Sequence, residues 1–173
     1  MKAPFLIPFF AFFVVVSASF AQNVAFEKEN FRGRESQFNK AFEQLRQGNK
    51  LFEKGINEYE AALPMLLAAN KFNPSNALLN MRIGICYLNG INKSQAFDFI
   101  NKAWELDNNV DPKIQFYLGQ CRQLSGKWTE AVSHYEAYIS IIQNADYLTP
   151  QQKRDILYNN AARFLRLDKT VGK

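Results

Sequence analysis

The side chains that could support catalysis or bind a metal ion are few in this chain of 173 residues. The only histidine, His134, and the two cysteines, Cys86 and Cys121, lack the spacing of an ordinary zinc site. No glycine-rich phosphate loop and no serine nucleophile motif occurs. Four glutamates fit the solvated face of a helix better than an acid–base pair: Glu58, Glu60, Glu130 and Glu136. The sequence therefore predicts no catalytic residue, no metal and no cofactor, and indicates that the protein is not an enzyme.

A repeated segment indicates which elements hold these side chains. Residues 77–104 align with residues 112–139 at a constant offset of 35 positions, without a gap. An earlier copy also aligns, with about two residues inserted around Ile56 and Asn57, so we expect a longer inter-helix turn there. Small residues recur at matching positions of the three copies and predict close helix–helix contacts: Gly48, Gly84 and Gly119, then Ala62, Ala96 and Ala131.

The spacing of these small residues resembles the tetratricopeptide repeat, in which two helices form each unit of about 34 residues. The resemblance covers residues 34–140 and implies an all-α fold, a three-repeat helical solenoid. It further implies a scaffold that binds other proteins. Two residues depart from the family pattern: Arg122 stands where a Tyr is usual, and Tyr138 where an Ala is usual. These changes alter the side chains that line the groove and that contact the next helix.

In this family the first helix of each pair lines a concave groove, and some members hold a C-terminal carboxylate there. The expected polar residues are largely replaced in this chain, so we expect a mixed apolar groove that accepts an extended or helical segment of a partner protein. An alternative for Ile85 is packing between repeats. The predicted partner-binding residues are Leu78, Met81, Ile85 and Asn89 in the middle repeat, and Lys113, Phe116, Gln120 and Gln123 in the third.

The N-terminus has the features of a secretory signal peptide over residues 1–21. Lys2 supplies a positive charge, residues 5–16 are almost wholly apolar, and Ser19-Phe20-Ala21 fits a cleavage site. The apolar stretch is short for a membrane span, so we expect cleavage and no stable span afterwards rather than an uncleaved anchor. The protein is then exported to the periplasm or the outer-membrane periphery. Residues 22–33 lack periodicity and are expected to form an N-terminal arm.

The net charge of +5 comes from basic residues that are dispersed along the chain. Dispersed charge on an exported protein argues against nucleic-acid binding, and a solvated basic surface explains it better. Attraction to an acidic envelope surface or partner is a weaker inference from the same charge.

Residues 141–173 are expected to form a linker and a C-terminal capping helix. Thr149 and Gln152 have the spacing of a capping box, and an apolar stripe over residues 150–167 fits a helix that covers the last pair. Two further caps are expected, from Ser94 for the second helix of the middle repeat and from Asp111, with Pro112 at the first helical position.

Two longer resemblances suggest alternative origins. Residues 30–55 and 59–90 are similar to the N-terminal repeat region of Bacteroidota envelope proteins, in which a β-propeller and an OmpA-type peptidoglycan-binding domain follow and some members belong to type IX secretion machinery. Residues 148–167 resemble the last helix of amidohydrolases, although no catalytic residue of those enzymes is matched. We therefore expect an exported adaptor of the cell envelope. The alternatives are a structural envelope component that has lost its anchoring domains and, last, the remnant of a hydrolase fusion.

The cysteines permit a separate prediction. Cys86 and Cys121 hold the same position of neighbouring repeats, on first helices that we expect to run side by side. Packed helices lie about 8–10 Å apart, whereas a disulfide needs Cα atoms within about 7 Å. We therefore expect two buried, reduced thiols.

Overall fold

The computed structural model describes residues 22–159 and is all-helical over that range. The predicted signal peptide, residues 1–21, lies outside the described residues, as do residues 160–173 at the other end. Within residues 22–159, no helix is both long enough and apolar enough to cross a bilayer.

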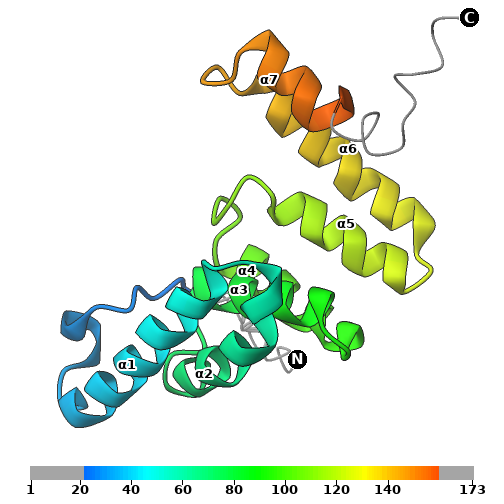
Figure 1. Ribbon diagram of the computed structural model, residues 1–173. Helices are drawn as coiled ribbons and strands as arrows, with labels where there is room; N and C mark the ends of the chain where they lie inside the picture. Colours follow the sequence, from blue (N-terminus) through cyan, green and yellow to red (C-terminus); the bar gives the residue numbers. More distant parts are fainter. Residues whose placement is uncertain (1–21, 160–173) are drawn as a thin grey trace, which may run out of the picture.

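Six of the helices form three pairs that follow one another along the chain (Figure 1). In each pair the second helix packs against the first, and the second helix of one pair also contacts the first helix of the next. The pairs are α1 (Glu35–Phe52) with α2 (Tyr59–Phe72), α3 (Ala77–Asn89) with α4 (Ala96–Leu106), and α5 (Ile114–Leu124) with α6 (Trp128–Asn144).

Glycines bring the two helices of each pair together, as their spacing predicts. A methyl group on Gly84 would lie 2.5 Å from Cδ1 of Ile100 on α4, and one on Gly119 would lie 2.5 Å from Cε1 of Tyr135 on α6. The corresponding distance at Gly48 is 2.7 Å, to Leu66 on α2. Real side chains do not approach so closely, so a larger residue would force the facing side chain or the paired helix to move.

Both cysteines lie in the apolar core that runs through the pairs. Cys86 and Cys121 are buried and are not joined by a disulfide. Burial raises the pKa of each thiol to about 12, because the charged thiolate would lose its hydration there. The prediction of two buried, unpaired thiols is confirmed.

The N-terminal arm, residues 22–33, is attached to the turn between α2 and α3. The Val24 amide donates to the Ser75 carbonyl at 2.8 Å, and the Val24 carbonyl accepts from the side-chain amides of Asn73 and Asn76. The side-chain oxygen of Asn23 accepts from the Ala77 amide at 3.0 Å. The arm is therefore part of the folded structure, although its sequence has no hydrophobic periodicity that would predict these contacts.

A cluster of phenylalanines fixes the other end of the arm. Phe31, in a short 3₁₀ helix (η1, Lys28–Phe31), packs against Phe72 of α2 with ring centroids 4.7 Å apart, and against Phe38 of α1 at 5.8 Å. The ring of Phe26 contacts those of Phe31, Phe38, Phe42 and Phe72, with centroids 5.9–6.3 Å apart. These are favourable separations for aromatic pairs, so the arm covers the start of α1 and the end of α2.

Several predicted helix boundaries are wrong by a few residues. Ser94 lies inside a 3₁₀ helix (η3, Lys93–Gln95) and does not cap α4. The carboxylate of Asp111 accepts from the Lys113 amide at 2.7 Å, but it closes a turn ahead of α5, whose first residue is Ile114. The first inter-helix turn, residues 53–58, is longer than the third, residues 125–127, as expected, but it is no longer than the second, residues 90–95. Residues that the sequence spacing assigned to the ends of α-helices instead form short 3₁₀ helices or turns.

The predicted capping box after α6 is confirmed. The Thr149 side chain accepts from the Gln152 amide, and the Gln152 side chain accepts from the Thr149 amide. The helix that follows, α7 (Pro150–Arg154), continues into a π-helical segment (η4, Asp155–Asn159). Lys153 Nζ donates to the Gln143 carbonyl at 2.7 Å and ties α7 to the end of α6. The remainder of the predicted capping helix, residues 160–167, lies outside the described residues.

Candidate partner-binding pocket

The predicted groove residues of the middle repeat do not form an open groove. Met81 and Ile85 are buried in the core, which agrees with the alternative that Ile85 packs between repeats. Leu78 is 42% exposed, at the start of α3. Asn89 is exposed at its end and donates to the Ile85 carbonyl at 2.8 Å. The interior of α3 is therefore occupied by packing, and only its two ends are open to a partner.

The predicted residues of the third repeat lie differently. Lys113 is exposed and Phe116 and Gln120 are half-buried, while exposed Gln123 accepts from the Tyr135 hydroxyl at 2.7 Å. Lys113 and Phe116 line one pocket of about 630 Å³. Gln120 and Gln123 do not line it. Two of the eight predicted residues are therefore brought together at a cavity.

This pocket lies between the start of α5, the end of α6, and the loop and helix that follow α6. Phe116 lines it and contacts Tyr117 and Tyr138, with ring centroids 5.8 Å and 5.6 Å apart. We call it the α5–α6 pocket. The residues that line it are Asp111, Pro112, Lys113, Phe116, Tyr117, Tyr138, Ile142, Tyr147, Leu148 and Ile156.

The tyrosines give the α5–α6 pocket hydrogen-bond donors among apolar walls. Burial raises the pKa of Tyr117 to about 12, with a smaller contribution from the Asp111 carboxylate. Burial also raises the pKa of Tyr138, and Asp111 again adds to the shift. Both hydroxyls therefore stay protonated at neutral pH and can donate to a carbonyl. An apolar pocket with a few such donors suits a segment of another protein.

Sequence reasoning missed most of these lining residues. Tyr138 carried a usable signal, because the repeat family usually has an alanine there and the larger ring enters the pocket. Tyr147, Leu148 and Ile156 belong to the segment after α6, which was expected only to cover the last pair. Their position depends on the turn at residues 145–149, whose direction the sequence does not specify.

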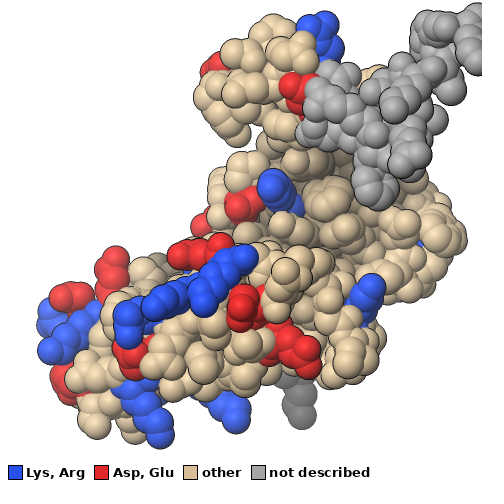
Figure 2. Space-filling model, viewed as in Figure 1, with Lys and Arg blue, Asp and Glu red and all other residues tan. Residues whose placement is uncertain are grey.

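The two ends of the row of helix pairs differ in polarity. On the first pair, a pocket is lined by the charged or amide side chains of Gln37, Lys40 and Lys71 together with apolar surface from Ala68 and Phe72. On α6, by contrast, Val132 and Ile139 are exposed on one stripe. Figure 2 agrees: charged side chains gather over the first pairs, while the visible surface of α5 and α6 is mostly uncharged. The last pair is therefore the part that is best suited to cover apolar surface of another molecule.

The side chains that could hold a metal ion lie apart in the described part of the chain. Within residues 22–159, no three side chains of the His, Cys, Asp and Glu types come together as metal ligands would. His134 Nδ1 lies 2.8 Å from the Gln115 side-chain oxygen. Burial lowers the pKa of His134, and the positive charge of Arg122 lowers it further. Its surroundings are those of a packed side chain.

Two comparisons with known proteins found no match. No protein-family model matches the chain, and a search of curated proteins finds no match either. Paired helices need only a few small and apolar positions to pack, so their sequences can diverge widely at every other position.

Proposed function

We propose that this chain is an exported, tetratricopeptide-type interaction module of the cell envelope. It binds an apolar segment of a partner protein in the α5–α6 pocket and has no catalytic activity of its own. Its three helix pairs form a short solenoid of the kind found in Bacteroidota envelope proteins, with the segment after α6 as the C-terminal cap. The predicted signal peptide is the basis for placing it in the periplasm or at the outer-membrane periphery.

The observation that carries this proposal is the cavity on the last pair. Phe116, Tyr138 and Ile142 would pack against apolar side chains of the partner, and the two half-buried phenols of Tyr117 and Tyr138 can donate to its backbone. Lys113 and Asp111 on the rim offer one charge of each sign. The repeated glycine contacts support the architecture, because they set the close approach of helices that such repeats need.

Site-specific crosslinking in the cells that make the protein tests the pocket. A photo-crosslinking amino acid is placed at Tyr147, which is exposed on the pocket wall, and at Lys40 on the polar face of the first pair as the matched control. We expect one discrete protein adduct from position 147 and none from position 40. The adduct should disappear in the Phe116→Ala variant, while the circular-dichroism spectrum stays helical.

Two outcomes would contradict the proposal. Adducts of equal yield from both positions would show that the pocket is not the contact site. A position-147 adduct that survives Phe116→Ala and Tyr138→Ala together would show that the partner touches this wall without entering the cavity. N-terminal sequencing of the purified protein decides separately whether residues 1–21 are removed.

A further inference from the structure

The turns that join the two helices of each pair carry exposed apolar side chains. Gly55-Ile56-Asn57 in the first turn recurs as Gly90-Ile91-Asn92 in the second, 35 residues later. The third turn, after Gly126, places Trp128 at the same end of its pair. Ile56 is 61% exposed, Ile91 94% and Trp128 64%. Turns are ordinarily polar, so a large apolar residue exposed at each of these positions indicates contact with another molecule and not a role in folding.

The three turns lie on one edge of the molecule, at the right-hand end of each pair in Figure 1. The first two turns line a common pocket of about 460 Å³, which contains both Ile56 and Ile91. The second turn reaches the third pair, since η3 packs against α5. We call this row of three turns the turn edge.

Basic side chains accompany the three exposed apolar residues. Each turn contains one exposed lysine: Lys54, Lys93 and Lys127. Two acidic residues at this edge are ion-paired: Glu53 lies 3.7 Å from Arg82, and Glu130 lies 3.0 Å from Arg122 and 3.7 Å from Lys127.

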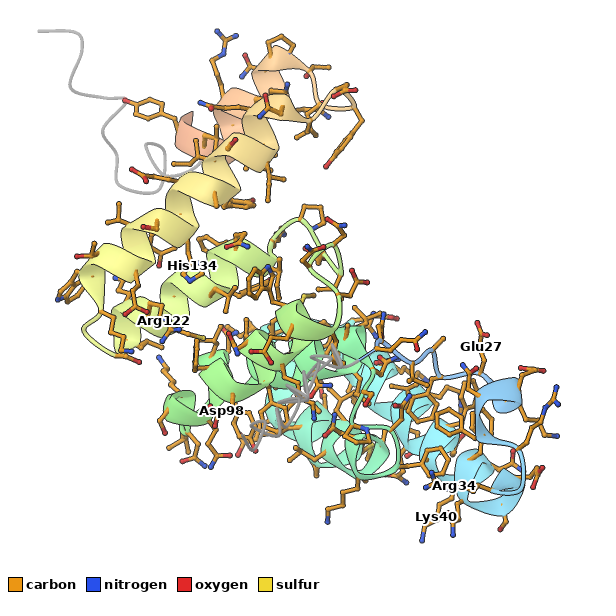
Figure 3. The ribbon with its side chains drawn as sticks, turned by 180° about the vertical axis from the view of Figure 1, so that it is seen from behind. Glu27, Arg34, Lys40, Asp98, Arg122 and His134 are labelled. Atoms are coloured by element: carbon orange, nitrogen blue, oxygen red, sulfur yellow. The ribbon has the colours of Figure 1, made fainter. Side chains whose placement is uncertain are left out.

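Three more carboxylates lie close to the turn edge. Glu58 ends the first turn, Glu60 is in the first turn of α2, and Asp98 is in the first turn of α4. Figure 3 shows Asp98 at this side of the molecule, at the left of that view with Arg122, and far from Arg34 and Lys40. The edge is therefore nearly neutral overall, and the lysines lie directly beside the apolar residues.

We propose that the turn edge rests on the surface of a phospholipid bilayer. Ile56, Ile91 and Trp128 enter the boundary between headgroups and acyl chains, where large aliphatic and indole side chains are favoured. Lys54 and Lys93 lie where they can reach the lipid phosphates, so positive charge stands beside the inserted side chains although the edge as a whole is nearly neutral, while Lys127 lies 3.7 Å from Glu130. A protein partner fits this edge less well, because Trp128, at the start of α6, lies outside the pocket that Ile56 and Ile91 share, so the three side chains do not line one groove. The inference stands on its own residues and does not depend on the α5–α6 pocket.

Fluorescence of Trp128 tests the proposal directly. The chain has two tryptophans, and the Trp104→Phe variant leaves Trp128 as the only reporter. The protein is purified from exporting cells and mixed with vesicles of phosphatidylcholine alone, or of phosphatidylcholine and phosphatidylglycerol at 3:1. We expect the Trp128 emission to shift to the blue, acrylamide quenching to fall, and the protein to sediment with the vesicles. The anionic vesicles should bind more tightly, and added salt should reduce that difference.

A pair of matched variants assigns the binding to the edge. Ile91→Glu should weaken vesicle binding at least about tenfold, because a charged side chain replaces an inserted apolar one. Tyr147→Glu, at another exposed position, in the α5–α6 pocket, should leave vesicle binding unchanged. Neither residue is buried, so both variants should keep the circular-dichroism spectrum and the melting temperature of the parent.

Three results would overturn the inference. One is an unshifted Trp128 spectrum with both kinds of vesicle, even if the protein sediments, since residues 1–21 could then be the part that binds. Another is equal affinity of Ile91→Glu and the parent. The third is a photo-crosslinker at position 91 that yields a protein adduct and no lipid adduct in cells. Loss of the Tyr147 crosslink alone would leave this inference untouched and would count only against the pocket.

Discussion

Replacing Phe31 with alanine tests whether the N-terminal arm is part of the folded structure. Phe31 is 8% exposed, whereas Phe42, in the same cluster, is 44% exposed. Phe31 contacts three rings, those of Phe26, Phe38 and Phe72. Full removal of a buried phenylalanine costs about 3–5 kcal/mol. We expect the low end, about 3 kcal/mol, because the arm lies at the surface and can settle into part of the space.

The matched control is Phe42→Ala, which removes the same side chain from a site that is nearly half exposed. Its expected cost is about 1 kcal/mol, since much of the ring is already in contact with water. Urea unfolding followed by circular dichroism measures both free energies. For a chain of this size, the Phe31 variant should also melt about 6–12 °C lower. Amide hydrogen exchange at Val24 adds a local readout, because its hydrogen bond to Ser75 should open more often when the arm is released.

Equal stabilities for the two variants would refute this reasoning. If Phe31→Ala unfolds within about 0.5 kcal/mol of the parent, the ring is not buried and the arm does not cover the first pair. If the free energy falls as expected but exchange at Val24 is unchanged, the hydrogen-bonded and aromatic halves of the arm act independently.

Three further predictions follow from burial. Met81→Glu should unfold the protein or lower its melting temperature strongly, because it places a charge in the apolar core. Leu78→Glu, at an exposed position, should change the free energy of unfolding by no more than about 0.5 kcal/mol. Equal melting temperatures of the two variants would contradict this prediction. Thiol titration should detect neither Cys86 nor Cys121 in the native state up to pH 9 and both after denaturation, because pKa values of about 12 keep the thiols protonated; rapid native labelling would disprove their burial. The pKa of His134 is lower in the folded than in the unfolded protein, so its contribution to stability is present above pH 6.5 and is lost as the pH falls toward the folded pKa. The melting temperature should therefore drop less between pH 7.5 and pH 5.5 in His134→Gln than in the parent. Equal drops would exclude His134 as the cause of the loss of stability.

The features that the sequence predicted correctly are set by local spacing. Gly84 and Ala96 are 12 residues apart, and so are Gly119 and Ala131, so each pair of small residues falls on the facing sides of two helices joined by a short turn. The capping box at Thr149 is equally local, since donor and acceptor are three residues apart. Such features depend on the geometry of one helix or one hairpin, and the sequence specifies that geometry directly.

The errors arise where burial depends on more distant neighbours. Met81 and Ile85 were expected to line a groove, and the spacing does place them on one face of α3. Whether that face is open depends on how far the next pair twists over it, and α3 does pack against α5. The arm was missed for a similar reason. Phe26 and Phe31 have no helical period, and their partners come from two helices that the sequence alone does not bring together.

Position within the row of pairs explains why the candidate pocket lies on the last pair. Met81 and Phe116 occupy the same position of their repeats, yet Met81 is buried and Phe116 faces a cavity. Phe97 and Val132 also match; the guanidinium of Arg122 on α5 lies 3.9 Å from the centre of the Phe97 ring, whereas Val132 is exposed. A following pair covers both positions in the middle repeat, and within residues 22–159 none follows α6. Equivalent residues therefore act as core in one repeat and as binding surface in the next, which a repeat alignment alone cannot distinguish.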